Sequence, residues 1–168
     1  MIYSGIGARD TPPETLKLMR SVGRFMAKCG HTLRSGGANG ADSAFEEGCD
    51  EHDGTKQIFL PREGFRGNLS LLFGSCLASR QIARQFHPYW DNLGDLGRDF
   101  MARNVYQVLG QDLKTPADFI VCWTKNGKPV GGTGQALRMA EHYQIPVVNF
   151  ALHDKEGAEV LIQQLLGE

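Results

Sequence analysis

Glycine is concentrated at three places in this sequence where it could help to bind an anion. Of the 21 glycines in 168 residues, most of those that precede predicted helices gather in residues 5–9, 35–40 and 131–134. Glycine lets the backbone approach a ligand closely and adopt positive φ angles. A helix amino terminus presents unpaired N–H groups and a partial positive charge, which together suit phosphate. The three clusters therefore predict a phosphate-binding site.

Polar side chains in these clusters add to the predicted site. Arg9 offers a fixed positive charge that suits bidentate contact with phosphate. Ser35, Thr133 and Gln135 offer hydrogen-bond donors. The full set of ligand-binding candidates is Gly7, Arg9, Ser35, Gly36, Gly37, Ala38, Asn39, Asp42, Trp123, Gly131, Gly132, Thr133, Gly134 and Gln135.

Three of these candidates could contact the nucleoside part of a ligand. Asp42 or Asn39 could accept a hydrogen bond from a ribose hydroxyl, although Asp42 would also complement the positive end of a helix. Trp123 ends a predicted strand beside the site, where its ring could stack on a base. The aromatic loop at residues 86–90 could stack on a base too, but such loops more often pack onto the sheet or form a dimer contact.

The established nucleotide-binding motifs are absent. The sequence has no G-x-x-x-x-G-K-[ST] pattern, and the glycines at 5 and 7 are not completed to G-x-G-x-x-G because position 10 is Asp10. A nucleoside triphosphatase or an ordinary dinucleotide-binding protein is therefore disfavoured.

The segments around the glycine clusters alternate between strand and helix patterns, which predicts a parallel sheet. Thr11 and Glu14 form a capping-box pattern at the start of the first predicted helix, with Pro12 at its first position. We expect a three-layer, Rossmann-like α/β sandwich with about five strands. Its strands are predicted at residues 2–7, 31–34, 57–61, 118–123 and 146–150.

Residues 62–115 lack strand patterns and predict a helical insertion between the third and fourth strands. Within it, residues 99–109 have clear helical spacing. Arg103 and Asn104 could reach a phosphate if this helix covers the site, but a surface or ion-pair role suits each of them better.

Composition limits the other classes of function. Lys and Arg number 18 and Asp and Glu 19, so the net charge of −1 argues against a protein that coats nucleic acid or an anionic membrane. No basic leader or apolar run of about 18 residues is present, which predicts a cytoplasmic protein. The four cysteines are scattered, which predicts reduced thiols and no metal site. The length predicts a single domain over residues 1–168.

The first two glycine clusters resemble a known family. Gly5-Ile6-Gly7-Ala8-Arg9 and Ser35-Gly36-Gly37-Ala38-Asn39-Gly40-Ala41-Asp42 are similar to the signatures after strands one and two of DprA-like Rossmann domains, roughly G-S-R and S-G-x-A-x-G-[IA]-D. Residues 131–135 resemble the later glycine turn of the wider SLOG superfamily, which includes the YspA-like and lonely-guy (LOG) groups. The resemblance implies a pocket for a nucleotide or a nucleotide-derived ligand.

The third cluster departs from the lonely-guy motif, P-G-G-x-G-T-x-x-E. Lonely-guy enzymes cleave the N-glycosidic bond of nucleoside monophosphates. Here Val130 replaces the motif's proline, Gln135 its threonine and Arg138 its catalytic glutamate, while Glu141 lies about one turn later. The missing carboxylate weighs against the same hydrolytic activity.

Three functions remain open. The first is a cytoplasmic sensor or sequestering protein that binds a nucleotide-derived ligand, with no further cofactor. The second is an N-glycosidic-bond hydrolase whose carboxylate is Glu141, Glu46 or Asp42. The third is a single-stranded DNA-binding accessory in recombination, which the acidic pI of about 6.5 disfavours. The resemblance also implies a homodimer or tetramer.

Overall fold

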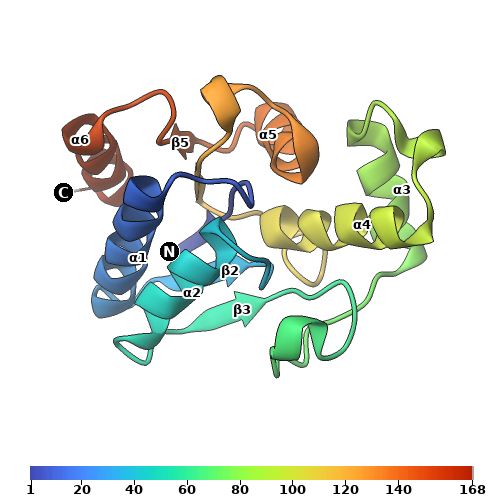
Figure 1. Cartoon of the computed structure of the whole chain (residues 1–168), viewed down its shortest axis with the longest axis horizontal. Helices are drawn as coiled ribbons and strands as arrows, with labels where there is room; N and C mark the ends of the chain where they lie inside the picture. Colours follow the sequence, from blue (N-terminus) through green and yellow to red (C-terminus); the bar gives the residue numbers. More distant parts are fainter. Residues whose placement is uncertain (168) are drawn as a thin grey trace.

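The computed structural model, which describes residues 1–167, is built on a single five-stranded parallel sheet (Figure 1). The strands follow the order β3-β2-β1-β4-β5, and every neighbouring pair is parallel. From β1 the chain adds β2 and β3 on one side of that strand. It then crosses over and adds β4 and β5 on the other side. The strands are β1 (Ile2–Gly5), β2 (Thr32–Ser35), β3 (Lys56–Ile58), β4 (Phe119–Cys122) and β5 (Val147–Asn149).

Helices cover both faces of the sheet, which gives three layers. One face packs against α1 (Pro13–Lys28), α2 (Ala41–Asp50) and α6 (Lys155–Leu166), and the other packs against α4 (Asp95–Leu109) and α5 (Gly131–Tyr143). Helix α3 (Leu77–Phe86) packs on α4 and α5 (Figure 1). Side chains of β4 alternate between the two cores, since Phe119 and Val121 join the first and Ile120 and Cys122 the second. All four are fully buried, as expected for a parallel strand covered on both sides.

These features confirm the predicted three-layer, Rossmann-like sandwich with five strands. Residues 62–115 contain α3, α4 and the short 3-10 turns Phe65–Gly67 and Trp90–Asn92. Because α4 provides the crossover that any parallel connection from β3 to β4 requires, only the residues before it are additional to the basic fold. Among residues 1–167, no helix is long and apolar enough to cross a lipid bilayer.

The predicted capping box at the start of α1 is wrong. Pro12 is the N-cap residue and Pro13 the first helical residue, and no side chain caps the helix. Thr11 instead donates its hydroxyl proton to the carbonyl oxygen of Ala8, at 2.6 Å. This bond tightens the turn that follows β1, which is the turn carrying the first glycine cluster.

Helices α1 and α2 pack closely because glycine occupies both sides of their contact. A Cβ atom on Gly23 would lie 2.5 Å from the carbonyl oxygen of Phe45, and one on Gly48 would collide with the carbonyl oxygen of Arg20. Both obstacles are backbone atoms, so a side chain at either position would push the helices apart. The position of α2, and with it the second glycine cluster, depends on this contact.

We therefore expect Gly48→Ala to lower the free energy of unfolding by about 1–3 kcal/mol through overpacking. Helix propensity alone would change it by about 1 kcal/mol in the opposite direction. Urea denaturation would measure the change. Gly97→Ala in α4 is the matched control, because its Cβ would meet only the flexible side chain of Leu93, at 3.3 Å. A Gly48→Ala variant that gains as much stability as Gly97→Ala would contradict the close packing.

Candidate functional site

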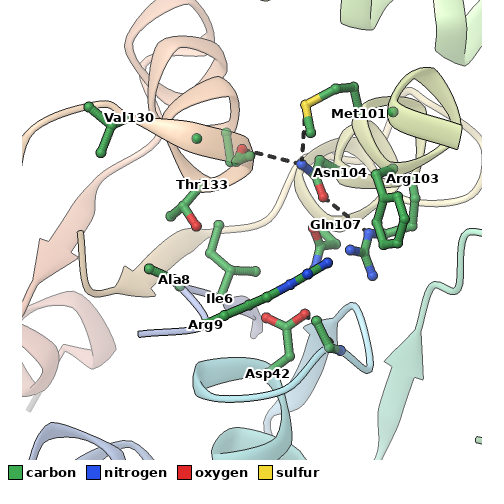
Figure 2. A pocket seen from close by; sticks show the side chains of 17 residues that line it. Ile6, Ala8, Arg9, Asp42, Met101, Arg103, Asn104, Gln107, Val130 and Thr133 are labelled. Carbon is green, nitrogen blue, oxygen red and sulfur yellow. Dashed lines mark hydrogen bonds between the residues drawn. The ribbon is translucent and has the colours of Figure 1, made fainter. Parts of the chain in front are cut away.

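A pocket of about 450 Å³ opens between the loops that follow β1 and β4, where the strand order reverses (Figure 2). In open parallel sheets this reversal leaves a crevice at the carboxyl ends of the strands, and ligands bind there. The loop after β1 contributes Gly7 and Arg9 to the lining, the loop before α5 contributes Val130, and the first turn of α5 contributes Thr133. Helix α4 covers the pocket from the side.

Positive charge enters the pocket from two of its walls, the first turn of α5 and the Arg9 side chain (Figure 2). Helix α5 begins at Gly131 with Val130 as its N-cap residue, and no side chain caps it. Its first turn therefore presents backbone N–H groups to the pocket, beside the hydroxyl group of Thr133. The guanidinium group of Arg9 lies 5.7 Å from the centre of the Phe100 ring and adds a full positive charge. This combination suits an anionic group.

Asp42 is the acidic residue of the pocket lining. It is the second residue of α2, has an exposed fraction of 4%, and accepts a hydrogen bond from the backbone N–H of Ala38 at 3.2 Å. Burial raises the pKa of Asp42 to about 6, although Arg103 and the N–H of Ala38 act to lower it. The carboxyl group therefore titrates close to neutral pH.

Two buried side chains of α4 connect the walls of the pocket. Arg103 donates from Nη1 to the carbonyl oxygen atoms of Gly36 and Phe59, and from Nε to Oδ1 of Asn104 at 3.1 Å. Asn104 in turn donates from Nδ2 to the carbonyl oxygen of Gly132 at 3.2 Å (Figure 2). Burial lowers the pKa of Arg103. The second and third glycine clusters are thus held by the same pair of residues.

This connection explains two of the glycines. A Cβ atom on Gly36 would collide with Nη1 of Arg103, and one on Gly132 would lie 2.9 Å from Nδ2 of Asn104. Glycine at these two positions makes room for side chains of α4. The predicted surface or ion-pair roles of Arg103 and Asn104 are wrong, since both are buried and bond to backbone carbonyl oxygen atoms. Helical spacing alone does not show which face of α4 meets the sheet.

Several predicted ligand residues lie outside the pocket lining. Ser35 is fully buried and donates its hydroxyl proton to the carbonyl oxygen of Gly5 at 2.7 Å. Gln135 is also fully buried and donates to the carbonyl oxygen of Met101 at 2.8 Å. Trp123 packs against the core beneath α1 and α2. The predicted residues that do line the pocket are Gly7, Arg9, Ala38, Asp42, Gly131, Gly132 and Thr133, whereas Ser35, Gly36, Gly37, Asn39, Trp123, Gly134 and Gln135 do not.

Two of the three candidate catalytic carboxylates also lie elsewhere. Glu46 pairs with Lys56 at 2.9 Å and accepts hydrogen bonds from Asn68 at 3.1 Å. Glu141 is exposed and lies about three helical turns beyond the first residue of α5. Arg138 donates to the carbonyl oxygen of Pro129 at 3.0 Å and so supports the loop before α5. Any carboxylate chemistry in the pocket would fall to Asp42.

The aromatic loop at residues 86–90 packs chiefly away from the pocket. Phe86 contacts the His142 ring, with 5.3 Å between ring centres, and Trp90 is buried in the core that α4 and α5 share. Tyr89 is exposed. None of the three lines the pocket, so Phe100 of α4 is the aromatic ring that a ligand there would meet.

Solved structures with the same fold include proteins with different ligands. No family model and no curated protein matches this sequence. The molybdenum cofactor (Moco) carrier protein of Chlamydomonas reinhardtii superimposes with a TM-score of 0.60 at 19% identity, over 99% of this chain and 98% of the carrier. DNA processing protein A of Helicobacter pylori, whose structure concerns single-stranded DNA binding, gives 0.57 at 19% identity, over 89% of this chain and 64% of its own.

A third structure, TM1055, gives a TM-score of 0.51 at 19% identity, over 87% of this chain and 71% of its own. At these identities the likeness establishes the fold alone. The chain shares the Rossmann-like fold of these proteins, one of which is a DNA processing protein A like those whose signatures its first two glycine clusters resemble.

The raised pKa of Asp42 predicts a measurable effect on stability. An aspartate has an ordinary pKa of 3.8, so stability falls as pH rises from about 4 to about 6, where the unfolded chain loses this proton before the folded chain does. We expect Asp42→Asn to remove this loss and to raise the free energy of unfolding at pH 7.5 by up to about 3 kcal/mol. The advantage should vanish near pH 4. Denaturant titrations of both proteins between pH 4 and 8 would measure it.

A variant that is less stable than the wild type at pH 7.5 would contradict this prediction. It would mean that attraction between Asp42 and Arg103 outweighs the effect of burying the carboxylate.

Proposed function

We propose that the pocket binds a nucleotide or a nucleotide-derived ligand, with its phosphate at the amino terminus of α5. The observation that carries this proposal is that Arg9 and the uncapped first turn of α5 meet in one pocket where the strand order reverses. Neither group would be enough by itself. Together they supply the backbone donors and the fixed charge that a phosphate requires.

The rest of the pocket suits a flat ring system. Ile6, Phe100, Met101 and Val130 give it an apolar wall next to its charged groups. Ligand pockets typically combine such walls with a few polar groups, in volumes of about 300–1,000 Å³. At about 450 Å³ the pocket fits a mononucleotide better than a dinucleotide.

We infer that the protein holds its ligand as a sensor or sequestering protein. One structural neighbour is named as a carrier of a small cofactor, and this chain matches that protein over nearly its full length. The molybdenum cofactor therefore belongs in a ligand screen beside the nucleotides. The cytoplasmic location and the homodimeric or tetrameric state stay predictions from the sequence.

Arg9→Ala should weaken the binding of nucleoside monophosphates by roughly 10- to 100-fold, because a hydrogen bond to a charged group contributes about 1.5–3 kcal/mol. Isothermal titration would measure the affinities. Arg62→Ala is the matched control: Arg62 also lies over a phenylalanine ring, that of Phe65 at 5.6 Å, but does not line the pocket. Equal losses in both variants would contradict phosphate binding by Arg9.

A ligand screen by thermal shift would find the compound for that titration. A ligand at 100 times its dissociation constant stabilises the folded state by about 2.7 kcal/mol. Release of free base from a nucleoside monophosphate would favour the hydrolase instead. Binding of single-stranded DNA with a steep salt dependence, unaffected by Arg9→Ala, would favour the recombination accessory.

A further inference from the structure

Asp42 lies on a different wall of the pocket from the phosphate-binding end. Figure 2 shows its carboxylate on α2 and Thr133 on α5, with the Arg9 side chain passing between α2 and α4. A phosphate close to Asp42 would be repelled by the carboxylate. A ligand with one anionic group would therefore place it at α5 and turn its other end toward Asp42.

The carboxylate is held rigidly. Asp42 follows Ala41, which is fully buried, and its Oδ2 atom accepts the N–H of Ala38. With an exposed fraction of 4%, the side chain has little freedom to swing out into solvent. Figure 2 shows the carboxylate of Asp42 pointing into the pocket from α2, and Asp42 is part of the pocket lining.

The basic residues near Asp42 do not occupy its carboxylate, so the carboxylate can accept hydrogen bonds from a ligand. Arg103 directs Nη1 to two carbonyl oxygen atoms and Nε to Asn104, while Arg9 lies against the Phe100 ring. In the part of the chain that the structure describes, neither arginine forms an ion pair with Asp42. The donors that act on Asp42 from within the chain are backbone N–H groups, those of Ala38 and Gly36, and they do not offset the cost of burying its charge. A ligand that supplies further donors would therefore gain affinity.

We propose that Asp42 determines the specificity of the pocket by selecting ligands that present two adjacent hydrogen-bond donors at the end opposite their phosphate. This inference rests on the proposed function. A carboxylate oxygen atom has two acceptor positions, so two neighbouring donors can bind Asp42 together without displacing Ala38. In a nucleotide, either the vicinal hydroxyls of the ribose or the N1–H and 2-amino groups of a guanine-type ring provide such a pair.

Three mononucleotides distinguish these two sources. Guanosine 5′-monophosphate has both donor pairs, its 2′-deoxy analogue lacks the ribose pair, and inosine 5′-monophosphate lacks the 2-amino group. We expect the wild type at pH 7.5 to bind the first roughly 10- to 100-fold more tightly than one of the other two. Weaker binding of the deoxy analogue identifies the ribose hydroxyls, and weaker binding of the inosine compound identifies the base edge.

Asp42→Asn should reduce this preference to about threefold or less while leaving the affinity for inorganic phosphate equal or higher. Glu47→Gln is the matched control, because it makes the same carboxylate-to-amide change on an exposed position of α2 and should keep the preference. A wild type without any preference, or an Asp42→Asn variant that retains it, would overturn the inference.

The wild type offers a second test that needs no variant. Protonation of Asp42 removes its capacity to accept at both positions, so the preference should decline as pH falls through about 6. The other charged groups that act on Asp42 are Arg103 and Glu46; the Arg103 guanidinium stays charged in this range, and Glu46 pairs with Lys56. A preference that is constant from pH 7.5 to 5 would contradict the role of Asp42.

Failure of this inference is distinguishable from failure of the proposed function. If phosphate compounds bind through Arg9 with no Asp42-dependent preference, only the inference is wrong. If the wild type binds none of them, inorganic phosphate included, both are wrong.

Discussion

The burial of the Arg103 guanidinium constrains how α4 docks beside the pocket. This side chain has an exposed fraction of 5%, and such a charge is tolerated only when its N–H groups find acceptors. Its acceptors are the carbonyl oxygen atoms of Gly36 and Phe59 and the side chain of Asn104, which itself holds Gly132. Because these groups come from separate parts of the chain, docking α4 onto the sheet shapes the loops and forms the pocket in the same step.

The buried carboxylate of Asp42 is less well compensated than the buried guanidinium of Arg103. The charge of Arg103 and the backbone N–H groups of Ala38 and Gly36 act to lower the pKa of Asp42, yet burial dominates and raises it to about 6. A fold optimised for stability alone would place a neutral residue there. Strongly perturbed groups in pockets are typical of functional sites, although ion-pair networks produce them as well. The contrast between a satisfied Arg103 and an incompletely satisfied Asp42 is what sets the latter apart.

The sequence was sufficient for those parts of the site that depend on local patterns. Each glycine cluster follows a strand, and a parallel sheet brings the strand ends to one edge, so Arg9, Asp42 and Thr133 could be placed together. Which acceptor a polar side chain finds depends on distant partners instead. Ser35 bonds to Gly5 across the sheet, and Arg103 bonds to Gly36 from 67 residues away. No local pattern contains either contact.

A nearly neutral protein can bind the proposed anionic ligand if its positive groups are concentrated in one pocket. A polymer of phosphates requires an extended basic surface, whereas a single phosphate in a pocket with apolar walls requires one arginine and one helix terminus, since low-dielectric surroundings strengthen both. The net charge of −1 favours the second arrangement. Asp42 strengthens this conclusion, because its charge in the same pocket would oppose a second phosphate on the ligand.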